Sequence, residues 1–116
     1  MSLIVAAVIL AGTWGLLRDS LNLALHAVPP GIDPGAVEAY LVALPGVKGV
    51  HDLHIWGMST TDSALTAHIV KPDAHDDDAL LARMTEELHD RFGIEHATVQ
   101  WERSEMERPC VGCEPT

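Results

Sequence analysis

The chain has 116 residues, of which 47% are apolar and only 4% aromatic, so it can form one small domain with an aliphatic core. Its 7 basic and 17 acidic residues give a net charge of −10. This balance argues against a nucleic-acid-binding protein, whose affinity depends on cations facing phosphates, and it favours attraction of cations. The length excludes a large catalytic apparatus with its own cofactor domain.

The first segment is an apolar run without charges, residues 3–17 (LIVAAVILAGTWGLL), and it predicts the end of a transmembrane helix. An amphipathic stretch continues this pattern until Pro29 and Pro30 stop it. Two alternatives stay open. The segment could be a helix packed in a core or against a partner. It could also be a secretory signal, although a basic leading region and an A-x-A cleavage site are missing.

From residue 32 onward the pattern predicts a compact mixed domain. Asp33 and Pro34 form a helix start, an N-cap followed by proline at the first helical position. The remaining elements follow in chain order: a helix ending before Pro45-Gly46, a strand over 47–58, a strand over 64–70, a helix whose N-terminus lies at the acidic run 76–78 and which is capped by Gly93, and a strand over 94–101.

This order, α-β-β-α-β, predicts an α+β fold in which three antiparallel strands carry two helices on one face. The uncovered face of so small a sheet favours pairing with a second copy of the chain. The predicted organisation has three parts: residues 1–28, the membrane-helix end and an amphipathic linker; 29–103, the α-β-β-α-β domain, which is expected to dimerise; and 104–116, a flexible polar tail that carries the C-x-x-C.

Several potential metal ligands occur on the predicted strands and the tail. They are His51, His54, His68, Glu102, Cys110 and Cys113. A single histidine is more often a surface imidazole than a metal ligand. Zinc, however, binds sets of thiolate, imidazole and carboxylate groups. Because strand ends converge in space, these residues together indicate a metal site more strongly than any one of them alone. The pattern does not fix the hairpin register, so whether the two strand histidines face the same side stays open.

The sequence contains few motifs for catalysis. The His51-Asp52 pair resembles half of a general-base arrangement, but no G-x-S-x-G nucleophile motif and no glycine-rich phosphate loop occurs. We therefore expect that the protein is not an enzyme. A redox module built on Cys110 and Cys113 is a further alternative, disfavoured because the pair lies on a tail and not at a helix N-terminus.

The strings WGLLRDSLNLALHAV, LPGVKGVHDLHIW, LTAHIV and RFGIEHATVQWE, with the closing C-x-x-C, resemble the cation diffusion facilitator family. These proteins export zinc, cobalt and cadmium, and the similarity is greatest to the zinc-transporting branch. The resemblance covers nearly the whole chain. It implies a last transmembrane helix followed by a cytoplasmic domain of the metallochaperone-like (ferredoxin-like) α-β-β-α-β fold.

The resemblance also implies the site residues. It places a cytoplasmic zinc site on His51, His68 and Glu102, and a second zinc site on Cys110 and Cys113. The remaining ligands of the second site would come from a Cys/His-rich N-terminal segment of a neighbouring subunit, which this chain does not contain, so we expect weaker binding there. The implied cofactor is Zn²⁺, with Co²⁺ or Cd²⁺ as alternatives.

The histidines outside this set receive lesser roles. His54 and His96 match positions that are often histidine in the family and are expected to support the site. His75 is expected to be solvated, and His26 and His89 are expected on helix surfaces.

The implied role is regulatory. The family moves metal through His and Asp residues on its second and fifth transmembrane helices, and residues 1–25 contain no such site. The chain alone is thus expected not to transport, and to be a fragment or a stand-alone module. We expect a homodimer, anchored in the inner or plasma membrane by residues 1–17 with residues 29–116 in the cytoplasm, in which zinc draws two acidic domains together. The alternative is a free cytosolic zinc buffer or metallochaperone, if the helix does not insert.

Overall fold

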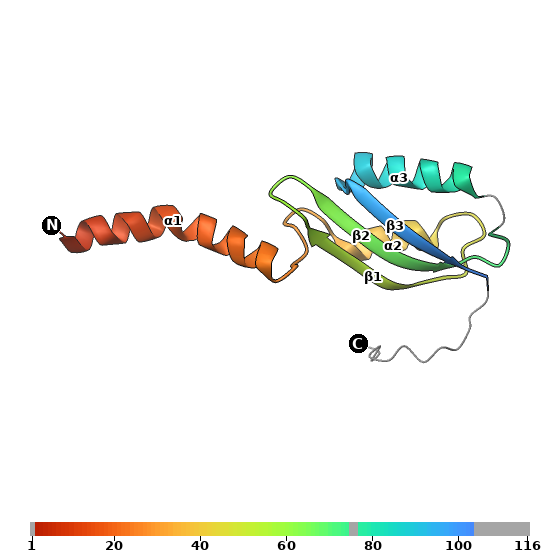
Figure 1. Ribbon diagram of the computed structural model, residues 1–116, viewed down its shortest axis with the longest axis horizontal. Coiled ribbons are helices and arrows are strands. Elements are labelled where there is room, and N and C mark those ends of the chain that lie inside the picture. Colours follow the sequence, from red (N-terminus) through yellow and green to blue (C-terminus); the bar gives the residue numbers. More distant parts are fainter. Residues whose placement is uncertain (1, 75–76, 104–116) are drawn as a thin grey trace.

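The computed structural model describes residues 2–74 and 77–103. Its elements are α1 (Ser2–Ala24), α2 (Pro34–Val42), β1 (Gly49–Gly57), β2 (Ser63–Val70), α3 (Asp78–Phe92) and β3 (His96–Glu102). The predicted helix-strand-strand-helix-strand order after an apolar helix is therefore confirmed, as is the α+β class. Figure 1 shows α1 extending away from the domain that the other five elements form.

The N-terminal helix α1 has 23 residues, none of them buried, and it is long and apolar enough to cross a membrane. The helix ends at Ala24, whereas the amphipathic pattern of the sequence continues to residue 28. His26 adopts a left-handed conformation with φ of 51°. The amide of His26 donates to the carbonyl of Leu23, and the amide of Ala27 donates to that of Asn22. This is a Schellman-type ending, so His26 lies in the turn and not on the helix surface.

Local sequence signals set the ends of the two domain helices. The Asp33 carboxylate accepts a hydrogen bond from the Gly35 amide at 2.9 Å and caps α2, as predicted. Gly93 ends α3 in the left-handed region, with φ of 68°. Lys71, a buried residue, pairs with Asp77 at the N-terminus of α3 at 2.5 Å, which fixes the start of that helix against the end of β2.

The sheet has the order β1-β2-β3, and its pairing corrects one expectation. β1 and β2 form the predicted antiparallel hairpin, but β3 pairs parallel to β2 and not antiparallel. The reason lies in α3. A helix between two strands returns the chain to the end where the first strand began, so the next strand runs in the same direction.

Both domain helices cover the same face of the sheet. The fully buried side chains of α2 and α3, Leu41 and Leu88 among them, pack on Leu65 and Ile69 of the central strand. The opposite face is uncovered within the described residues. Apart from Ala64 and Val70, the side chains there are polar or aromatic and partly or fully exposed: His51, His54, Trp56, Thr66, His68, His96, Thr98, Gln100 and Glu102. Every candidate ligand on the strands is therefore on the face that the helices leave free.

The left-handed ending at Gly93 provides a test of the fold. A Cβ at this position meets no atom within 4 Å, so Gly93→Ala costs only backbone strain, about 1 kcal/mol of unfolding free energy. Gly49→Ala is the matched control, because that position is equally open and carries no positive φ. Urea unfolding measures both variants. Equal effects of the two substitutions would contradict the conformation at Gly93.

Candidate metal centre

The sheet register brings the strand ligands together. His51 of β1 lies directly opposite His68 of β2, which answers the question that the sequence pattern left open. On the other side of β2, His68 pairs with Gln100, and Glu102 follows two residues later on the same face of β3. Diagonal neighbours of this kind are within reach of a long side chain. Three strands thus contribute one group each to a single point near the end of the sheet.

A bulge in β1 lies at this point. The pairing of β1 with β2 is regular up to His51, shifts between His51 and His54, and then resumes. Asp52 sits in the irregular segment with a φ of 51°, a left-handed conformation that Asp tolerates better than most residues. Bulges of this kind often redirect side chains beside functional sites. Here the bulge places the Asp52 carboxylate 3.7 Å from His51 Nδ1 and 3.8 Å from His68 Nδ1.

The distances within the cluster suit a metal ion. His51 Nε2 lies 2.9 Å from Glu102 Oε2, and His68 Nδ1 lies 3.1 Å from Glu102 Oε1. One potential ligand atom from each of the three residues lies within 4.8 Å of the other two. Their side chains are 40%, 34% and 23% exposed in the order His51, His68, Glu102, so an ion could reach them from solvent. Two imidazoles and a carboxylate are ligands that zinc accepts.

The neighbours of Glu102 favour its charged form. Hydrogen bonding from His51 is the largest cause and holds the pKa of Glu102 below its usual value, with the charges of His51 and His68 acting in the same direction. Burial of the carboxyl opposes this shift. Gln100 Nε2 also donates to Glu102 Oε1 at 3.3 Å. The carboxylate is therefore kept ionised and oriented, as a metal ligand must be.

This arrangement predicts a pH effect in the metal-free protein. Because the folded-state pKa of Glu102 is lowered, its ionised form stabilises the fold above the usual pKa, and that stability is lost as the pH falls through the lowered pKa. His51→Ala should raise the pKa of Glu102 and shift this loss to higher pH. Carbon-13 NMR titration of the Glu102 carboxyl measures the change. His54→Ala, an exposed histidine on the same strand, should leave the titration unaltered, and an equal response to both substitutions would contradict the contact.

The other predicted residues lie apart from this cluster or outside the described residues. His54 and His96 are exposed on the same sheet face, paired with Thr66 and Ala64 of β2. His89 is on the surface of α3, as expected. Cys110, Cys113 and His75 lie outside the described residues. Sequence reasoning assigned no metal-site role to Asp52 and none to Gln100. An acidic residue within a strand, where Asp is rarely favoured, was the available signal for the bulge.

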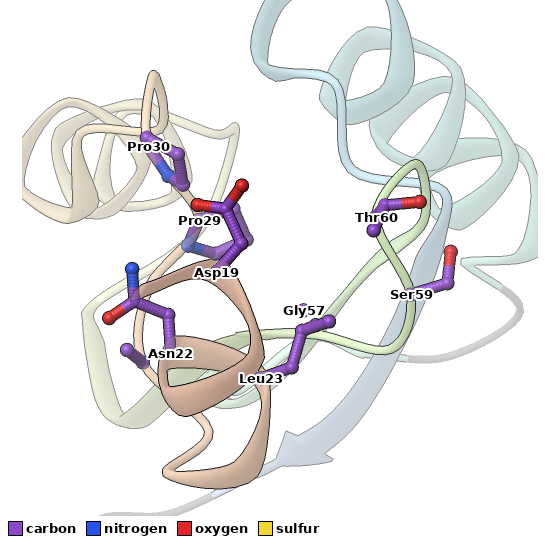
Figure 2. A pocket seen from close by; sticks show the side chains of 9 residues that line it. Asp19, Asn22, Leu23, Pro29, Pro30, Gly57, Ser59 and Thr60 are labelled. Atoms are coloured by element: carbon purple, nitrogen blue, oxygen red, sulfur yellow. The ribbon is translucent and has the colours of Figure 1, made fainter. Parts of the chain in front are cut away.

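A cavity of about 150 Å³ lies elsewhere, where the end of α1 meets the β1–β2 turn (Figure 2). Leu23 of α1 packs against Gly57, and a Cβ on that glycine would lie 3.0 Å from Leu23 Cδ2. Asp19 is the charged group in its lining, and no histidine contributes to it. The cavity therefore marks the junction between helix and domain and is separate from the histidine cluster.

Comparisons with known proteins agree with this architecture. The family model of the cation efflux protein cytoplasmic domain matches residues 29–104. The cation efflux system protein CzcD of Alcaligenes sp. (strain CT14) is 40% identical over 101 residues, which cover 86% of this chain and 32% of that protein. The zinc transporter ZitB of Escherichia coli K12 is 34% identical over 113 residues, covering 97% of this chain and 34% of that protein. The chain thus spans about a third of the length of these relatives.

A solved structure shares the fold as well. The metal-bound C-terminal domain of the CzcD transporter from Cupriavidus metallidurans is 39% identical and superposes with a TM-score of 0.55. The match covers 61% of this chain and 99% of that domain. The chain therefore belongs to the cation efflux protein family, with residues 29–104 matching the family's cytoplasmic domain.

Proposed function

We propose that this chain is the zinc-binding, dimer-forming regulatory part of a cation efflux transporter, joined to the last membrane helix. The observation that supports this most is the convergence of His51, His68 and Glu102 from three strands onto one point. The relatives add chemical context, because one is named a zinc transporter and the related CzcD domain is described as metal-bound. Transport belongs to the whole transporter, of which this chain covers about a third.

Zinc is the proposed ion because of the donor set. Two imidazole nitrogens and a carboxylate oxygen suit Zn²⁺, and they also accept Co²⁺, whereas Cd²⁺ favours softer donors such as the thiolates of Cys110 and Cys113. An ionised Glu102 adds charge attraction to a divalent cation. We further propose the cysteine pair as a second, weaker zinc site, since two thiolates leave a tetrahedron half filled.

The uncovered sheet face is the proposed dimer surface. The chain carries a net charge of −10, so two copies repel each other, and a divalent ion bound at the face of each domain lowers that repulsion. Zinc concentration would then be coupled to the distance between the two domains, which is the basis of a regulatory effect on transport. The proposed mechanism needs no covalent chemistry, and we propose that the protein is not an enzyme.

The proposed location follows from α1. Its apolar side chains are exposed along the whole helix, for example Ile4 at 68% and Leu16 at 70%. Inserted in the inner or plasma membrane, this helix would leave residues 29–116 in the cytoplasm. The alternative function, a free zinc buffer or metallochaperone, uses the same ligands without a membrane. Flotation of the full chain with lipid vesicles separates the two, because a buffer protein would stay in the aqueous fraction.

The regulatory proposal predicts a zinc-dependent change of shape. We expect the full chain, in detergent, to be a dimer whose radius of gyration in small-angle X-ray scattering decreases when zinc is added. Mg²⁺ is the control ion, since it prefers octahedral oxygen ligands and should cause no compaction. Monomers at all concentrations with and without zinc, measured by light scattering, would contradict the dimer. A dimer with an unchanged radius would contradict zinc control of its shape.

A further inference from the structure

The imidazole ring of His51 lies between two carboxylates. Its Nε2 is 2.9 Å from Glu102 Oε2, and its Nδ1 is 3.7 Å from Asp52 Oδ2. Glu102 belongs to the group of three residues whose ligand atoms converge, and Asp52 stands outside that group. We infer that Asp52 is a positioning residue, which accepts a hydrogen bond from Nδ1–H of His51 and so holds Nε2 toward the metal ion. This inference rests on the proposed metal-binding function and adds the residue that orients one of the ligands.

The proton of the His51 ring gives Asp52 its role. An ionised carboxylate only accepts hydrogen bonds, so in the metal-free protein the Nε2–H group of His51 donates to Glu102. A metal ion binds a nitrogen lone pair, so an ion at Nε2 requires the single proton of the neutral ring to be on Nδ1. Asp52 is the carboxylate that faces Nδ1. A metal-bound histidine usually donates its second N–H to such a group, which fixes the tautomer and the orientation of the ring.

The distance between the two groups leaves a short movement to make. A hydrogen bond needs about 3.2 Å or less, so Asp52 Oδ2 would approach His51 Nδ1 by about 0.5–1 Å when the ion binds. The Asp52 side chain is 32% exposed, so it is not enclosed in the core. A divalent ion at Nε2 withdraws electrons from the ring, which makes Nδ1–H a stronger donor and attracts the carboxylate.

Asp52 can position only one of the two histidines in this way. Its Oδ2 also lies 3.8 Å from Nδ1 of His68. That same nitrogen is 3.1 Å from Glu102 Oε1, so Nδ1 is the atom that His68 directs at the carboxylate of the ligand group. Once Nδ1 of His68 holds the ion, it carries no proton for Asp52 to accept. The hydrogen bond is therefore made with His51, and toward His68 the charge of Asp52 adds only attraction for a cation.

The bulge in β1 brings Asp52 to this side of the sheet. Regular alternation along β1 would point residue 52 to the face opposite His51, toward the helices. His51 pairs with His68 and His54 pairs with Thr66, so three steps along β1 match two steps along β2. Asp52 lies in this irregular segment with a left-handed φ of 51°, and its carboxylate is beside the two histidine rings. The irregularity thus supplies the ligand His51 with a hydrogen-bond acceptor.

Two variants of Asp52 separate hydrogen bonding from charge. The parent is the full chain in detergent with Cys110→Ser and Cys113→Ser, so that the tail thiolates cannot take the metal. Asp52→Gly removes the acceptor and adopts a positive φ without strain, whereas Asp52→Asn removes the charge but keeps an oxygen that accepts from Nδ1–H. We expect the Zn²⁺ affinity, measured by chelator competition, to fall about 10-fold or more in Asp52→Gly and less than about 3-fold in Asp52→Asn.

Glu95→Gln is the matched control for charge. Glu95 also faces a histidine, with its Oε1 3.2 Å from His89 Nε2, and the substitution removes one negative charge away from the cluster. We expect this variant to bind Zn²⁺ as the parent does. Equal losses of affinity in Asp52→Gly and Asp52→Asn would show that the charge and not the hydrogen bond matters, and would overturn the positioning role.

Nitrogen-15 NMR of the histidines in the zinc-loaded chain detects the hydrogen bond itself. We expect His51 to bind zinc through Nε2, with an Nδ1 proton that exchanges slowly with water in the parent and in Asp52→Asn and rapidly in Asp52→Gly. Zinc binding through Nδ1 of His51 in the parent, or parent-like affinity in Asp52→Gly, overturns the role of Asp52 alone. If circular dichroism shows that the glycine variant is unfolded, the spectrum of the parent decides. A parent chain that binds no zinc would refute the proposed function itself.

Discussion

His68→Ala is expected to weaken zinc binding at the strand site by at least about 100-fold, because it removes a ligand from the centre of the cluster. His68 lies on the middle strand and faces Glu102 at 3.1 Å, with the ring of His51 at a centroid distance of 5.2 Å. None of the other described histidines can take its place, since the remaining candidates of the open face, His54 and His96, pair with other positions of β2. Isothermal titration calorimetry should show the loss of one zinc equivalent.

The matched control is His89→Ala. This histidine lies on α3 and contacts two carboxylates, Asp90 at 3.0 Å and Glu95 at 3.2 Å, so it resembles the cluster in composition. We expect its replacement to leave the zinc stoichiometry and affinity unchanged. The same stoichiometry in wild type, His68→Ala and His51→Ala would show that the strand histidines hold no metal.

Leu41→Ala is expected to lower the free energy of unfolding by about 2–5 kcal/mol, the usual range for a leucine deleted from a closed core. Leu41 of α2 is fully buried and packs against Leu65 and Ile69 on the helix-covered face of the sheet. A domain of this size has a total stability of about 5–15 kcal/mol, so the loss removes a large share of it. Chemical denaturation of the metal-free chain, followed by circular dichroism, measures the change.

The adjacent residue gives the control for packing. Val42 lies on the same helix but is 46% exposed, so Val42→Ala should cost less than about 1 kcal/mol. Similar losses for the two variants would contradict the orientation of α2 on the sheet. The metal site is on the opposite face, and a folded Leu41→Ala variant should therefore still bind zinc.

The elements of this fold were predictable because their signals are local. Asp33 and Gly93 set helix ends through their own hydrogen bonding and backbone freedom, and both were identified from the sequence. The direction of β3 was not, because strand pairing depends on how α3 crosses the sheet and not on the alternation within the strand. The end of α1 was misplaced because the apolar pattern continues past Ala24, through Leu25 to Val28, whereas the left-handed backbone at His26 ends the helix.

The candidate site was predictable only in part. The resemblance pointed to His51, His68 and Glu102, but the pattern alone could not show that they meet, since that depends on the register of two strand pairs. The side of the sheet on which the Asp52 carboxylate lies could not be predicted correctly. Alternation assigns it to the covered face, and only the bulge, a non-local consequence of pairing with β2, moves it beside the histidines.

The central claim is that the strand cluster, and not the cysteine tail, is the principal metal site. X-ray absorption at the zinc edge tests this most directly, using the full chain with less than one equivalent of zinc. The account predicts a first shell of nitrogen and oxygen at about 2.0–2.1 Å with the outer scattering of imidazole. A first shell dominated by sulfur at about 2.3 Å would place the ion on Cys110 and Cys113 and contradict the account.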